Sequence, residues 1–83
     1  MTRDEANGQI AEVLMEKVRG DRFPSATQMT MLEEILPQDM TADYLDVLLE
    51  KIAEDKIPSI PMLQRIQRVA ESLPVVEADD LRS

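Results

Sequence analysis

The sequence contains no cysteine, no histidine and no tryptophan among its 83 residues. Disulfide bonds are therefore excluded, and so are zinc sites that need thiolate or imidazole ligands. The same absences exclude the catalytic pairs in which histidine activates serine or cysteine. Aspartate and glutamate remain as ligand types for hard cations. We expect a chain that is not an enzyme and that holds no cofactor or metal ion.

Aromatic residues are also scarce, with one phenylalanine and one tyrosine. The core must therefore be aliphatic and rich in methionine, of which there are six. A chain of this length forms one domain with a thin core. We expect that domain to span residues 1–74, followed by a flexible acidic tail at 75–83 that has no apolar periodicity.

Long apolar runs are missing. Runs such as Val47-Leu48-Leu49 are far shorter than the ~20 residues that a membrane-spanning helix needs. The charged residues at positions 1–5 lack the apolar stretch of a signal peptide. We therefore expect a cytoplasmic protein that does not enter a membrane.

Acidic residues outnumber basic ones by 17 to 9, which gives a net charge of −8. The excess is even, because residues 1–40 and residues 41–83 each carry −4. Neither half has the basic surface that attracts nucleic acid or an anionic membrane. Nucleic acid is therefore not expected as a partner.

The most informative pattern is a repeat at an offset of 34 residues. The alignment pairs residues 12–25 with residues 46–59, and seven of these fourteen pairs are identical. Five more pairs are conservative, and beyond them only the apolar rhythm continues. Both copies place the string Asp-basic-apolar-Pro-Ser at the same point, which indicates a duplicated helical hairpin.

Capping residues predict four helices, near residues 3–19, 26–36, 42–55 and 60–73. Thr2, Ser25 and Ser59 are suitable N-caps, because their side-chain oxygens can accept a hydrogen bond from a backbone N–H in the first turn. Thr41, or Asp39 before it, is expected to begin the third helix. Pro37 and Pro74 follow the second and fourth helices.

Apolar residues recur at helical spacing in all four segments. The predicted buried faces are Ile10, Val13, Leu14 and Val18; Met29, Leu32, Ile35 and Leu36; Tyr44, Val47, Leu48 and Ile52; and Leu63, Ile66, Val69 and Ala70. The ring of Tyr44 is expected in the core with its hydroxyl reaching solvent.

One hairpin alone would leave its apolar face in water. The expected fold class is therefore all-α, a four-helix bundle built from two duplicated helix–turn–helix units at about 3–36 and 42–73. Two alternatives remain open: a three-helix core with a loose first helix, and a dimer that completes its core between chains.

A row of acids marks one side of the third predicted helix. Asp43, Asp46, Glu50 and Glu54 have spacings of three, four and four residues. Like charges at these spacings destabilise a helix, so a basic partner surface, or Arg65 and Arg68 on the fourth helix, could compensate. A plain solvated face is the alternative interpretation.

Methionine and leucine supply candidate apolar contacts for a partner. Met15 and Leu49 are matched repeat positions beside the predicted core faces. Met31, Met40 and Met62 lie off those faces, where methionine serves either adaptable binding or core filling.

These patterns favour a non-catalytic protein–protein interaction module: an adaptor, a regulator or a subunit of a homodimer. Its predicted partner-binding residues are Asp43, Asp46, Glu50, Glu54, Met15 and Leu49. The alternative is an acidic inhibitor or immunity-type protein that covers the basic surface of a nuclease, toxin or DNA-binding protein. A carrier of a covalently attached group, through Ser25 or Ser59, is a third class.

Overall fold

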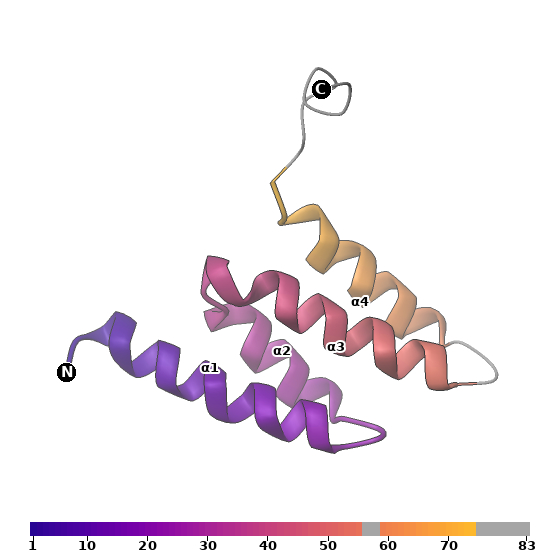
Figure 1. Ribbon diagram of the computed structural model, residues 1–83, viewed down its shortest axis with the longest axis horizontal. Helices are drawn as coiled ribbons and strands as arrows, with labels where there is room; N and C mark the ends of the chain where they lie inside the picture. Colours follow the sequence, from indigo (N-terminus) through magenta and orange to yellow (C-terminus); the bar gives the residue numbers. More distant parts are fainter. Residues whose placement is uncertain (56–58, 75–83) are drawn as a thin grey trace.

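The computed structural model describes residues 1–55 and 59–74, and in them the chain is all-helical (Figure 1). In chain order the elements are α1 (Arg3–Gly20), α2 (Ala26–Ile35), the 3₁₀ helix η1 (Gln38–Met40), α3 (Thr41–Glu54) and α4 (Ile60–Glu71). The predicted all-α fold with four α-helices is confirmed, and each helix ends within two residues of its predicted boundary. The tail expected at 75–83 lies outside the described residues.

Side-chain caps begin three of the α-helices as predicted. The Thr2 hydroxyl accepts a hydrogen bond from the Glu5 N–H at 3.1 Å, and Ser25 and Ser59 cap α2 and α4 in the same way at 3.3 Å. The third helix begins at Thr41, one of the two predicted starting residues. No side chain caps α3, because η1 leads directly into it, and the Thr41 hydroxyl instead donates to the carbonyl of Pro37 at 3.4 Å.

The helices form two pairs. α1 packs against α2, α3 packs against α4, and α3 also contacts α1. Figure 1 shows that the helices of each pair run in opposite directions, whereas α1 and α3 run side by side in the same direction. Among the described residues no helix has both the length and the apolar character that membrane crossing requires.

The core lies where the two pairs meet. Its buried residues are Ala11, Met15, Val18, Met29, Leu32, Thr41, Tyr44, Val47, Leu48 and Val69. Around it pack partly buried apolar side chains, which include Leu14, Ile35, Leu36 and Ile66. The predicted faces of α2 and α3 are thus largely confirmed, and of the predicted α4 face Val69 is buried.

The predicted face of α1 is wrong for two of its four residues. Ile10 and Val13 are 48% and 56% exposed, and the buried row is instead Ala11, Met15 and Val18. The two helices differ in burial because different elements of the fold cover them. The matching face of α3, with Tyr44 and Val47, is buried at the junction with the first hairpin, whereas no described element covers this side of α1.

On α4 the predicted face is also only partly buried, since Leu63 and Ala70 are exposed. Matched repeat positions therefore differ in burial between the hairpins. The supported fold is a compact four-helix arrangement with paired helix contacts.

Candidate protein-binding face

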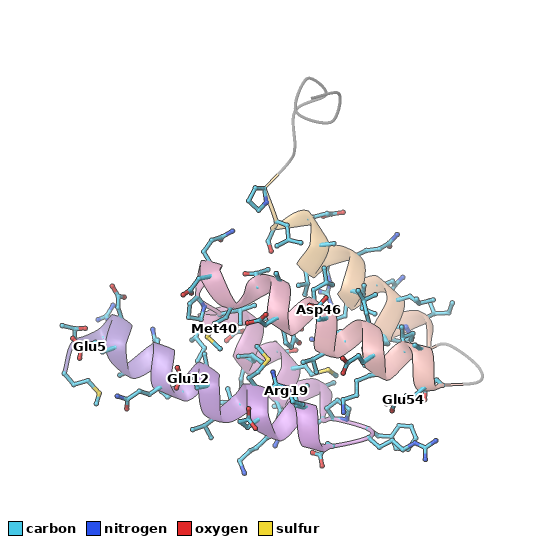
Figure 2. All side chains as sticks on the ribbon, in the orientation of Figure 1. Glu5, Glu12, Arg19, Met40, Asp46 and Glu54 are labelled. Atoms are coloured by element: carbon cyan, nitrogen blue, oxygen red, sulfur yellow. The ribbon has the colours of Figure 1, made fainter. Side chains whose placement is uncertain are left out.

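The acidic row predicted from the sequence lies on the solvent side of α3. Asp43, Asp46, Glu50 and Glu54 are all exposed. At about 100° per residue, the four positions fall within an arc of about 80° of the helix circumference. They extend over roughly 16 Å of the helix axis, at about 1.5 Å per residue. Figure 2 marks two of them, Asp46 and Glu54, along α3.

No basic side chain compensates this row within residues 1–55 and 59–74, where the ion pairs join Arg19 to Glu16 and Arg65 to Glu33. Arg65 is one of the two arginines of α4 that the sequence suggests as partners of the α3 acids. It turns instead toward α2, where its guanidinium lies 2.7 Å from a carboxylate oxygen of Glu33. The acids of α3 therefore present their charge to solvent.

The structure adds two acids that sequence reasoning missed. Glu12 and Glu16 of α1 line a hollow of about 280 Å³ together with Met15, Arg19, Met40 and Asp43. Asp43 is the first residue of the α3 row, so the α1 acids and the row adjoin the same hollow. Figure 2 shows Glu12 of α1 across from Met40 of η1, with Arg19 farther along α1.

The repeat itself held a signal for these two residues. Glu12 and Glu16 occupy the positions that match Asp46 and Glu50 in the second copy. The hollow places Glu12 and Glu16 of α1 next to Asp43, the first residue of the acidic row of α3. The candidate site is therefore a two-helix acidic surface, here called the acidic face, made of Glu12, Glu16, Asp43, Asp46, Glu50 and Glu54.

The two predicted apolar anchors, Met15 and Leu49, differ in their exposure to solvent. Met15 is only 3% exposed and belongs to the core, so it is not available as a protruding contact. Its side chain contributes instead to the floor of the hollow. Leu49 is 44% exposed and lies beside the acidic row, where a partner can reach it. Their different burial shows that matched repeat positions have different surroundings in the two hairpins.

The other methionines with a predicted role, Met31, Met40 and Met62, also differ in their exposure to solvent. Met31 is exposed on α2, whereas Met40 and Met62 are half-buried against the core. Met40 borders the hollow beside the acidic face, and Met62 borders a different hollow near the starts of α2 and α4.

A polar cluster behind the acidic face joins three helices. The Tyr44 hydroxyl of α3 donates to a carboxylate oxygen of Glu33 on α2 at 2.5 Å, and Arg65 of α4 binds the same oxygen. The prediction that this hydroxyl reaches solvent is therefore wrong. Burial, together with the hydrogen bond and the negative charge of Glu33, raises the pKa of the Tyr44 hydroxyl above its ordinary value.

A second polar contact links α1 to α3. The Lys51 ammonium donates to the backbone carbonyl of Arg19 at 2.8 Å, in the last turn of α1. A cation is favourable at this position because the carbonyl groups at a helix C-terminus carry partial negative charge. This contact links α1 to α3 directly, whereas the Tyr44 cluster links α3 to α2 and α4.

The acids of the described residues are not grouped for a metal ion, and the hollows beside the helices are small. Among residues 1–55 and 59–74 no group of three or more acids is placed to hold a metal ion. Hollows of about 170, 220 and 280 Å³ border the helices. All are smaller than the roughly 300–1,000 Å³ typical of small-molecule sites. No protein-family model, no curated protein and no solved structure matches the chain.

Proposed function

We propose that this chain is a non-catalytic protein-binding module whose acidic face binds a basic surface of a partner protein. One observation carries the proposal. Acids from two helices lie along one side of the molecule, and within the described residues only Glu16 among them has an ion-pair partner. Like charges gathered in this way repel one another, and a basic partner would relieve that repulsion.

Charge and apolar contact have separate roles in this proposal. The acidic face accelerates the encounter with a basic partner and selects against acidic ones. Leu49 beside the row supplies apolar contact that slows dissociation. An inhibitor that mimics nucleic acid is a special case of the same proposal, in which charge dominates the binding.

We also propose that the two hairpins descend from one duplicated unit. Seven identical pairs in fourteen positions support this origin, as does the serine N-cap of both α2 and α4. Duplication accounts for the presence of acids at matched positions on α1 and α3.

The test is a capture experiment with three immobilised proteins: the natural chain, the double variant Asp46→Lys/Glu50→Lys, and the control Glu34→Lys/Glu71→Lys. Both variants change the net charge from −8 to −4, because two acids become two bases. Glu34 and Glu71 are exposed on α2 and α4, away from the acidic face. Circular dichroism verifies that all three proteins are equally helical.

We expect a partner that the natural chain and the control retain and that the Asp46→Lys/Glu50→Lys variant loses by about tenfold or more. Equal loss from both variants would show that only net charge matters, and the proposal would then be wrong.

A further inference from the structure

The hollow between α1 and α3 combines apolar and acidic groups. Its floor is formed by Met15 and Met40, and its walls carry Glu12, Glu16 and Asp43, with Arg19 at one end. Its volume of about 280 Å³ lies just below the roughly 300–1,000 Å³ of small-molecule sites and is sufficient for one side chain.

The floor is suited to an apolar guest. Methionine is flexible and polarisable, and it adapts to side chains of different shape. Met40 is only half-buried, which leaves part of its surface open to the hollow.

The walls determine which guest is favoured. Glu16 pairs with Arg19 at 2.6 Å, which neutralises that end of the hollow. Glu12 and Asp43, on α1 and α3, make no ion pair within residues 1–55 and 59–74. The hollow therefore has net negative walls around an apolar floor, and the acidic row of α3 continues from its edge.

We infer that this hollow binds one apolar side chain of the partner, flanked on the partner's chain by lysine or arginine. The inference rests on the proposed function and specifies the chemistry of the partner: a basic segment with an apolar anchor. Charge complementarity is the reason for this choice of occupant. A second copy of the chain, at −8, would bring further negative charge to the same walls.

The test uses two synthetic helical peptides. One carries a central leucine between lysines, and the other has alanine in place of that leucine. Their affinities are measured for the natural chain, for Met40→Gln, and for the control Met62→Gln. Glutamine keeps the length of methionine while making the floor polar. Met62 is an equally half-buried methionine at a different hollow, so it controls for loss of apolar surface in general.

For the natural chain and for Met62→Gln, we expect the leucine peptide to bind about tenfold more tightly than the alanine peptide, as is typical of one apolar group in a pocket. In Met40→Gln this difference should disappear, while the salt-dependent affinity for the alanine peptide stays. A second readout does not depend on any variant: with ¹³C-methyl methionine, the leucine peptide should shift the Met40 signal and leave that of exposed Met31 in place.

The two proposals fail in different ways. Equal affinity of the natural chain for both peptides would overturn the apolar anchor, yet the acidic face would stand if Asp46→Lys/Glu50→Lys still weakened both. If that variant weakened neither peptide, or if neither peptide bound, the acidic face itself would fail. Light scattering that showed a dimer of the natural chain, dissociated by Met40→Gln, would assign the hollow to a second copy and overturn the inference.

Discussion

At the scale of single residues, the most informative position is the only tyrosine of the chain. Tyr44 is fully buried, and its hydroxyl shares one carboxylate oxygen of Glu33 with Arg65. A charged pair this close to the core is stable only if its polar atoms are well paired, because burial removes them from water. The three side chains therefore form one hydrogen-bonded cluster that links α2, α3 and α4.

The Tyr44 cluster predicts a loss of stability at alkaline pH. In the folded chain the pKa of Tyr44 is raised, so the folded state keeps the phenolic proton to higher pH than the unfolded state does. The contribution of the Tyr44 hydroxyl to the free energy of unfolding is therefore complete below about pH 10, the ordinary pKa of tyrosine. It is lost as the pH rises above that value. Urea unfolding at pH 8 and pH 11 should show this loss in the natural chain and a smaller one in Tyr44→Phe. An equal loss in both proteins would assign it to other groups.

The ion pair gives a second prediction. Arg65→Met should lower the free energy of unfolding by about 1–3 kcal/mol, because it leaves the mostly buried Glu33 carboxylate without its cation. In a double-mutant cycle with Glu33→Gln, the coupling should be about 0.5–3 kcal/mol. Additive effects in chemical denaturation would show that the two residues act independently.

At the scale of helices, capping residues in the sequence predict where the helices begin and end. They do not predict which side of each helix is buried. Thr2, Ser25 and Ser59 cap their own helices, so the sequence alone predicts where those helices begin. Which side of α1 is buried depends on which neighbours cover it. Since Val13 has the same apolar character as its repeat counterpart Val47, nothing local distinguishes the exposed residue from the buried one.

The orientation of α3 about its own axis can be tested with two adjacent leucines. Leu48 is fully buried and Leu49 is largely exposed on the same helix. Leu48→Ala should lower the free energy of unfolding by about 2–5 kcal/mol, because it leaves a cavity in the core. Leu49→Ala should change it by less than about 1 kcal/mol. Chemical denaturation in which the two substitutions cost the same would contradict the packing of α3.

The candidate site was predictable only in part for the same reason. The four acids of α3 share a helix, so their spacing was enough to place them on one side. Glu12 and Glu16 join them only because α1 and α3 lie side by side, which no local pattern states. Met15 is buried rather than exposed as predicted, because its exposure depends, like that of Val13, on which side of α1 the neighbouring helices cover.

At the scale of the whole molecule, the acidic face should act against stability when no partner is bound. Asp46→Asn with Glu50→Gln removes two of its charges and should raise the free energy of unfolding by a few tenths of a kcal/mol at low salt. The gain should shrink as salt screens the repulsion, since exposed charges interact weakly beyond a Debye length of about 8 Å at 0.15 M. Urea unfolding at low and high salt measures both effects, and a loss of stability at low salt would show that these carboxylates are stabilised within the chain.

The central claim is that binding occurs on the acidic face of α1 and α3. The most direct measurement is a ¹H–¹⁵N NMR titration of the chain with the lysine-containing leucine peptide. The account predicts that the largest shift changes cluster at Glu12–Arg19 of α1, at Met40 of η1 and along α3, and that they weaken in high salt. Changes centred on α4, or spread evenly over all helices, would contradict it.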